Sequence, residues 1–160
     1  NTYVRDNIEF LKARTDGTIF TGVEGVRGTN LSLSTGAATD ITYVTASYNY
    51  DTWWVSGATF TVPAAAIPAG FTSIAVFCQV RARFASNATG YRRLRFLLNG
   101  AAAGSISVDA NSGAETEVSI TDFLICVAGD TIKAEAFQNS GGNLNLEVST
   151  IHVVRYAPVA

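Results

Sequence analysis

The pattern of apolar and polar positions is clearest in residues 71–84, FTSIAVFCQVRARF. Apolar side chains occupy every second position on one face, as in a strand: Ile74, Val76, Cys78 and Val80. The opposite face is apolar at Ala75 and Phe77 and becomes cationic only at Arg81 and Arg83. A strand with one solvated face is polar along that whole side. The pattern therefore predicts burial on both faces, one in the domain core and one against a neighbouring subunit.

The same alternation continues along the chain and predicts a series of short strands from residue 28 onward. Turn signals separate the strands, among them Asn99-Gly100, Gly129-Asp130 and the Gly-rich run 139–142. The expected strands are 29–34, 41–46, 58–62, 72–83, 92–98, 104–108, 116–127, 131–138 and 144–155. Short strands at this spacing predict an all-β sandwich or jelly roll of two antiparallel sheets.

Residues 1–14 carry the only helical pattern, with Val4, Ile8 and Leu11 on one stripe. So short a helix is marginal alone, and three copies packed about an axis would supply its partner. The triplets that begin at Gly22, Gly25 and Gly28 lack proline, so we interpret them as a flexible connector and not as collagen. We expect a helical attachment segment and linker over 1–27 and a head over 28–160.

If successive strands run up and down, alternate loops share one end of the sandwich. One pole then holds loops 63–70, 99–103 and 128–130. The other holds loops 85–90, 109–115 and 139–143, together with the Trp53-Trp54 segment. This second pole collects the longer Asn, Ser and Gly loops, so we expect it to be the working surface.

Composition limits the classes of function. The 160 residues suit one domain, with 48% hydrophobic and 15% charged residues. A net charge of −2 predicts no general attraction to nucleic acid or to an anionic membrane. No run of about 18 apolar residues predicts a membrane span. The polar start at Asn1, without Met or signal peptide, predicts a fragment or processed product.

Several segments, in this order, resemble the C1q/tumour-necrosis-factor-like (C1q/TNF-like) jelly roll. They are Tyr50-Asp51 with Ser56-Gly57 through Pro63, Gly70-Phe71 with its strand, Leu97–Gly100, Leu124–Ile132 and Leu144–Tyr156. The resemblance covers about residues 28–156. It departs from the family at Phe71, where a Tyr is usual, and at 151–154, where many members are rich in aromatic residues.

The opening segment, Asn1–Asn7 followed by Ile8–Leu11, is similar to a motif near the start of bacteriophage minor structural and fibre proteins. The two resemblances together imply a homotrimeric fibre head on the virion, joined to other virion proteins through its N-terminal segment. They also imply that the sheet with 71–84 and 144–156 faces the three-fold axis. The expected interface residues are Ala75, Phe77, Gln79, Arg81 and His152.

Candidate chemistry points away from catalysis. His152 lies in a hydrophobic strand, which favours a packed or interfacial ring over a general base. No Ser or Cys nucleophile sits in a turn beside a plausible base, and no phosphate loop or metal-spaced cluster occurs. Asp40 and Asp109 near the apical pole are too few to claim calcium. We expect a non-enzymatic protein without cofactor or metal, in which Cys78 and Cys126 are buried thiols rather than a disulfide.

Candidate binding residues are basic, aromatic or amide side chains. Five arginines, 81, 83, 92, 93 and 95, flank loop 85–90. They form either a patch for an anionic surface glycan, a phosphate-bearing polymer or sulfate, or inter-subunit pairs with Asp109, Glu115, Glu117 or Glu147. Of the adjacent Trp53 and Trp54, one is expected in the core and one exposed or at an interface. The expected ligand set is Trp53, Trp54, Asn87, Thr89, Tyr91, Arg92, Asn111, Asn139 and Asn143.

These residues predict a trimeric head that binds a host-surface receptor, a glycan of either anionic or neutral type. The alternative is a capsid or tail decoration protein that stabilises the particle. A glycan-degrading enzyme is a third hypothesis, and a carboxylate pair for it cannot be chosen from spacing.

Overall fold

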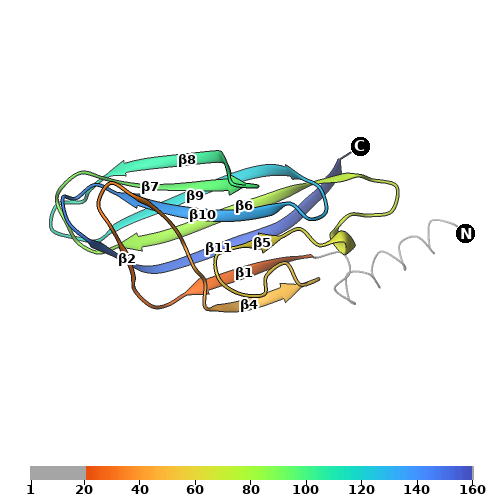
Figure 1. Cartoon of the computed structure of the whole chain (residues 1–160), viewed down its shortest axis with the longest axis horizontal. Coiled ribbons are helices and arrows are strands. Elements are labelled where there is room, and N and C mark those ends of the chain that lie inside the picture. The colour runs from red at the N-terminus through yellow and green to blue at the C-terminus, as the bar shows by residue number, and fades with distance from the viewer. Residues whose placement is uncertain (1–20, 160) are drawn as a thin grey trace, which may run out of the picture.

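Figure 1 shows a computed structural model of the chain, which describes residues 21–159 as two packed antiparallel sheets. Sheet A has the strand order β4-β1-β11-β6-β9, with β2 also paired to β11. Sheet B has the order β3-β10-β7-β8, with β5 also paired to β10. The predicted sandwich is confirmed, and the helix predicted over 1–14 lies outside the described residues.

Sheet A contains the strand around which the alternation was first recognised. Its strands are β1 (Gly22–Arg27), β2 (Leu31–Leu33), β4 (Thr45–Tyr50), β6 (Ser73–Phe84), β9 (Thr116–Cys126) and β11 (Leu144–Val159). Strand β6 lies between β11 and β9, and Phe77 pairs with Val154 on one side and Phe123 on the other. Ile74 through Phe84 alternate between buried and partly exposed positions, as the pattern predicted.

Sheet B forms the second layer, and its strands are β3 (Ala38–Asp40), β5 (Phe60–Thr61), β7 (Tyr91–Leu98), β8 (Ala101–Asp109) and β10 (Thr131–Gln138). Strands β7 and β8 form a hairpin closed by Asn99 and Gly100. Both turn residues have positive φ, 52° and 82°, which is the geometry of a two-residue type I′ turn. A short 3-10 helix, η1 (Ala64–Ala66), lies in the connection between β5 and β6.

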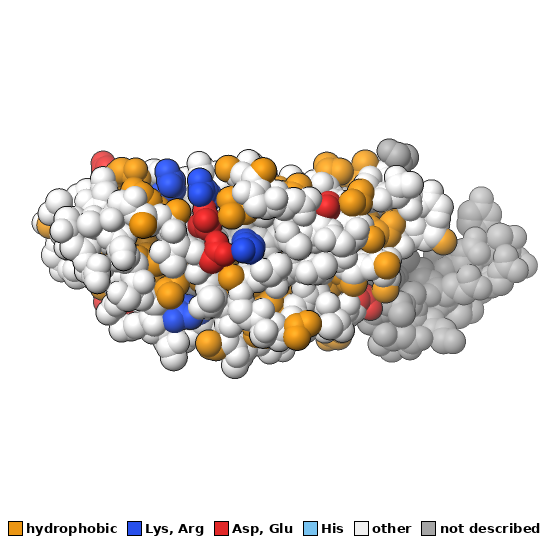
Figure 2. Space-filling view, viewed as in Figure 1, with side chains coloured by type: hydrophobic (Ala, Val, Ile, Leu, Met, Phe, Trp, Pro, Cys, Tyr) orange, Lys and Arg blue, Asp and Glu red, His pale blue; other side chains and the backbone are white. Residues whose placement is uncertain are grey.

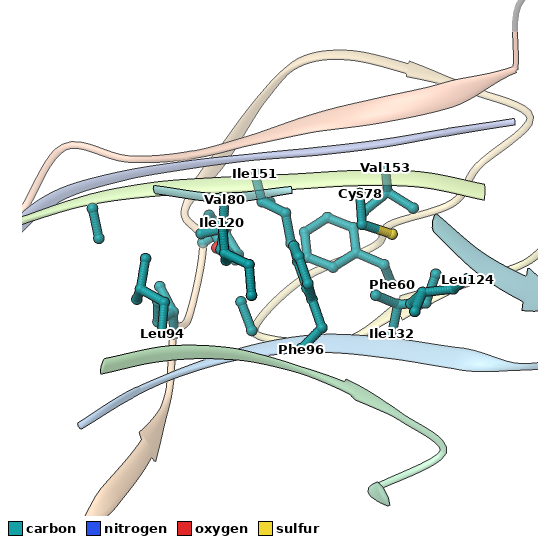
Figure 3. Packing of buried hydrophobic residues seen from close by; sticks show 14 of the residues in the cluster. Phe60, Cys78, Val80, Leu94, Phe96, Ile120, Leu124, Ile132, Ile151 and Val153 are labelled. Carbon is teal, nitrogen blue, oxygen red and sulfur yellow. The ribbon is translucent and has the colours of Figure 1, made fainter. Parts of the chain in front are cut away.

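The core lies between the two sheets, and Figure 3 shows the side chains that fill it. Cys78, Val80, Ile151 and Val153 enter from sheet A, and Phe96 enters from sheet B. All five are fully buried. The core is continuous along the sandwich. Loops close both of its ends, and the outer faces of the two sheets are left for other contacts.

The prediction of a flexible linker is wrong for Gly22–Arg27, because these residues form strand β1 between β4 and β11. Its glycines reflect close packing rather than flexibility. A Cβ added at Gly25 would lie 2.9 Å from Phe60 Cζ and 3.1 Å from Tyr43 Cγ. Aromatic rings occupy the space that a side chain would need, so the strand carries no apolar alternation at that point.

The single strand predicted over 41–46 is also wrong, because the chain crosses between sheets there. Strand β3 belongs to sheet B and β4 belongs to sheet A. Between them the buried Ile41 donates its N–H to Ala134 O at 2.8 Å, and Val44 donates to Val26 O at 3.0 Å. Ile41 and Tyr43 are core residues of a crossing segment, and their alternation resembles that of a strand.

Candidate subunit interface and ligand-binding surface

The outer face of sheet A carries every predicted interface residue. Phe77 and Gln79 project from β6 on the face opposite Val76 and Cys78. His152 lies on the neighbouring strand β11, where it pairs with Gln79. Ala75 and Arg81 lie on the same side of β6. The structure therefore brings the five residues together on one surface.

An apolar strip covers the half of this face nearest the chain ends. We define it as Phe77, Phe123, Ile125 and Tyr156. Phe123 is 51% exposed, Ile125 57% and Tyr156 70%. The ring centroids of Phe77 and Phe123 are 5.5 Å apart, and those of Phe123 and Tyr156 are 4.9 Å apart, both edge to face. Sequence reasoning missed Phe123, Ile125 and Tyr156. A signal existed for the first two, because one face of β9 changes from polar residues at 117, 119 and 121 to apolar residues at 123 and 125.

The other half of the same face is polar and internally paired. Arg81 Nη2 lies 2.6 Å from Glu117 Oε2, and Arg83 Nε lies 3.0 Å from Glu147 Oε2. Both glutamates were considered as partners across a subunit boundary, but here they pair within one chain. The His152 ring lies with Nε2 3.7 Å from Glu24 Oε1 and Nδ1 3.4 Å from the Tyr48 hydroxyl.

The apical pole is assembled as the alternation of strands predicted. Loops 85–90, 109–115 and 139–143 meet at the left end of the sandwich in Figure 1. Asn139 Oδ1 accepts the Tyr91 N–H at 2.7 Å, and Gly90 O accepts the Ala110 N–H at 2.9 Å. Asn87 Oδ1 accepts the Thr89 N–H at 2.8 Å, which shapes its own loop. Six predicted ligand residues lie at this pole: Asn87, Thr89, Tyr91, Asn111, Asn139 and Asn143.

Arg92 was predicted as a ligand residue, and this is wrong, because its side chain is fully buried. It faces inward on β7 together with Leu94 and Phe96, as strand alternation requires. Its guanidinium donates to the carbonyl oxygens of Asn87 at 3.0 Å and Thr89 at 3.1 Å. Burial lowers the pKa of the Arg92 guanidinium. The residue holds loop 85–90 in place from inside the sandwich.

Trp53 and Trp54 were predicted at the apical pole, and this is wrong too. Trp53 O accepts the Thr61 N–H, and Thr61 pairs with Thr131 beside the 128–130 turn, at the opposite pole. Strand β5 has only two residues, so segment 51–59 never returns to the apical end. Trp53 is buried and donates Nε1–H to Thr21 Oγ1 at 2.7 Å, whereas the half-buried Trp54 stacks on Phe60.

The five arginines do not form one patch. Arg81 and Arg83 lie on sheet A, Arg92 lies in the interior, and Arg93 and Arg95 lie on the outer face of sheet B. In Figure 2, basic and acidic side chains gather in one band over β7 and β10 of sheet B. Arg95 pairs there with Glu135, and Lys133 Nζ lies 2.7 Å from Asp40 Oδ2.

The described part of the chain offers few groups for metal binding or thiol chemistry. Residues 21–159 contain no cluster of three or more His, Cys, Asp or Glu side chains that could hold a metal ion. Asp40, considered for calcium, is paired with Lys133 instead. Cys78 and Cys126 are buried and free, and burial raises both thiol pKa values, that of Cys126 to about 12. Within the same residues no helix has the length and apolar character to cross a bilayer.

Comparison with known proteins gives structural likeness without sequence likeness. No family model matches the chain, and no curated protein matches it. The globular domain of zebrafish complement 1qA matches with a TM-score of 0.61 and 11% identity, over 83% of this chain and 94% of that one. Eiger TNF from S. frugiperda matches at 0.59 and 13%, over 88% and 95%.

A viral protein has the same fold. PRD1 vertex protein P5 matches with a TM-score of 0.52 and 15% identity, over 84% of this chain and 95% of that one. At such identities the likeness concerns the fold, and the matched length includes both sheets. Residues 21–159 form a C1q/TNF-like jelly roll, as the sequence motifs predicted.

Proposed function

We propose that this protein is the non-enzymatic, homotrimeric head of a bacteriophage fibre or spike, and that it binds a host-surface glycan. The observation that carries the proposal is the exposed apolar strip on the outer face of sheet A, within a fold shared by a complement globular domain and a viral vertex protein. The similarity of residues 1–11 to phage structural proteins supports the virion setting, with the N-terminal segment as the contact to other virion proteins.

Trimer formation is the first part of the proposal. Contiguous apolar surface on a soluble domain marks a contact site, and aromatic residues are enriched in such contacts. The strip consists of three aromatic rings and one isoleucine on a single sheet face. Three copies that join these faces about one axis would bury the strip and leave sheet B outward.

Receptor binding is the second part. The start of β1 and the end of β11 lie at the pole opposite the apical loops (Figure 1). A head attached through its N-terminal segment would therefore point the apical loops away from the particle. The loops offer exposed amide side chains at Asn111, Asn139 and Asn143, which can donate to and accept from sugar hydroxyls. Three weak sites on one rigid head gain avidity through multivalency.

A structural decoration protein is the second candidate, and one observation favours it. Asn87 and Asn139 already use their side-chain oxygens within the chain, and Arg92 fixes loop 85–90 from beneath. Loops braced in this way would also suit a head that only stabilises the particle. In that case the trimer forms but the apical surface has no ligand.

The deciding experiment incubates the full chain with host cells before and after enzymatic removal of surface glycans, and measures retention. Retention that disappears with the glycans supports the receptor-binding head. Absence of retention, with a trimer present by light scattering, supports the decoration protein instead. Loss of polymer length on prolonged incubation would contradict the non-enzymatic assignment. Asn143→Ala, which removes an exposed apical amide, should weaken retention without changing the oligomeric state.

A further inference from the structure

The outer face of sheet B carries one guanidinium that lacks a carboxylate partner. Arg95 pairs with Glu135, and Lys133 pairs with Asp40, so these two cations are neutralised locally. The side chain of Arg93, two residues before Arg95 on the same face of β7, makes no ion pair and no hydrogen bond with any group in residues 21–159. Its Nε is buried without a hydrogen-bond partner. Such a group retains unused donor capacity.

The Arg93 side chain is nevertheless held in position. Its guanidinium carbon lies 4.6 Å from the centroid of the Phe137 ring on the neighbouring strand β10. The Phe137 ring in turn stacks against Tyr91, with centroids 5.4 Å apart and planes 25° apart. A cation over an aromatic face loses little donor capacity, because the ring uses none of its N–H groups. The guanidinium is therefore oriented before any ligand arrives.

A groove lies beside this guanidinium. It has a volume of about 250 Å³ and is lined by Arg93, Arg95, Ala102, Ala103, Gly104 and Ser105. Strand β8 supplies only small side chains to its wall, and a register shift between Phe96 and Leu97 interrupts the pairing of β7 with β8 there. Because Arg93 is only half-buried, a ligand can approach its terminal Nη groups and the Ser105 hydroxyl from one side, whereas the buried Nε stays out of reach.

We propose that this groove binds the anionic group of an acidic polysaccharide, with Arg93 as the residue that recognises its carboxylate or sulfate. The arginine fork matches such groups with two parallel N–H···O bonds. The site adds an anion-binding subsite on the outer face of sheet B to the host-glycan binding proposed for the apical loops, so it rests on that function. A nucleic acid is a poorer fit, since the chain carries a net charge of −2 and the neighbouring cations are already paired.

Asp109 supplies an independent check on the electrostatics. It is exposed and pairs with Tyr91 across β7 and β8, while Arg93 pairs with Ser107, so Asp109 lies diagonally from Arg93 on the same face. Diagonal neighbours on a sheet lie roughly 7–8 Å apart. The carboxylate of Asp109 therefore repels an anion bound at Arg93. Removal of the Asp109 carboxylate should raise the affinity of an anionic ligand for Arg93 severalfold.

The test measures binding of the full chain to immobilised polygalacturonate, dextran sulfate and neutral dextran of matched length. The first two probes distinguish carboxylate from sulfate recognition. The wild type should bind at least one anionic probe and not dextran. Arg93→Gln should lose at least tenfold in affinity and Arg93→Lys should recover only part of it, because an ammonium lacks the planar fork. Asp109→Asn should bind more tightly.

The matched control is Lys133→Gln, which removes one positive charge from the same face at a residue already paired with Asp40. It should bind within about twofold of the wild type. Equal losses in Lys133→Gln and Arg93→Gln would show a non-specific charge effect and overturn the site. Host-cell retention that depends on glycans but is unaffected by Arg93→Gln would overturn the site and leave the proposed function standing. Absence of any retention by the wild type would overturn the proposed function, and with it the site. Thermal melts confirm that each variant is folded.

Discussion

Phe123→Ala is the sharpest test of the proposed assembly, because Phe123 is the centre of the apolar strip. Its ring contacts both Phe77 and Tyr156, yet about half of the residue is exposed, 51%, in the single chain. A large aromatic side chain has about 200 Å² of surface to bury, so about 100 Å² remains for a subunit contact. At about 25 cal/mol per Å², its burial contributes about 2.5 kcal/mol per protomer.

The effect on a trimer is three times as large. About 7.5 kcal/mol over three protomers corresponds to roughly five powers of ten in the association constant. The midpoint concentration of trimer formation scales with the square root of that constant, so it should rise by about several hundredfold. The single chain should also lose stability, by about 2.5 kcal/mol, because the other half of Phe123, about 100 Å², is already buried within it; this loss is separate from the change in association.

Sedimentation velocity over a dilution series measures the midpoint directly. Val55→Ala is the matched control, since Val55 is 82% exposed and lies outside the apolar strip. It should leave the midpoint unchanged. A wild type that stays monomeric at tens of micromolar, roughly the range in which such contacts form, would refute the reasoning. So would a Phe123→Ala variant that assembles at the wild-type midpoint.

Three further predictions concern the interior. Gly25→Ala should destabilise the fold by about 1–3 kcal/mol in urea denaturation, because the new Cβ would lie 2.9 Å from Phe60 Cζ. A flexible linker would tolerate the substitution. An unchanged urea midpoint would therefore contradict the packing of β1. Arg92→Gln should free loop 85–90, which hydrogen exchange would report as faster exchange at Thr89, and equal protection in both proteins would refute its bracing role. Burial raises the pKa of Cys126 to about 12, whereas a thiol in the unfolded chain has a pKa of roughly 8.5. The free energy of unfolding should therefore be independent of this group below about pH 8.5 and fall above it by about 1.4 kcal/mol per pH unit. Urea titrations at about pH 7.5 and 9.5 should show that loss, and Cys126→Ala should lessen it; an equal loss in both proteins would contradict the assignment.

Much of the fold could be predicted where local rules act alone. Residues 73–84 and 131–138 alternate cleanly because each strand has one face in the core. The Asn99-Gly100 turn could be placed because its positive φ angles suit those two residues. The grouping of loops 85–90, 109–115 and 139–143 followed from antiparallel order. The interface residues on β6 could be placed on one face because side chains alternate along a strand.

The errors arise where a distant contact outweighs the local pattern. Gly25 marks a strand packed under two aromatic rings, and its sequence neighbours carry no sign of those rings. The two-residue length of β5 kept Trp53 away from the apical pole, and this length is set by pairing with Thr131 and Ile132. The alternation of β7 indicates that Arg92 points inward. The sequence prediction placed it on the surface because charged side chains are usually exposed.

By itself, the sequence determined the secondary structure and the facing of most strands, because both depend on neighbours within a few residues. Only the tertiary structure decided which of the four arginines with outward side chains on β6 and β7 lacks a carboxylate partner within residues 21–159. Arg81, Arg83, Arg93 and Arg95 are alike in the sequence, and their state depends on which acidic residue the paired strand brings opposite. Strand pairing joins residues far apart in the chain, such as Arg95 with Glu135, and local patterns contain no information about that register.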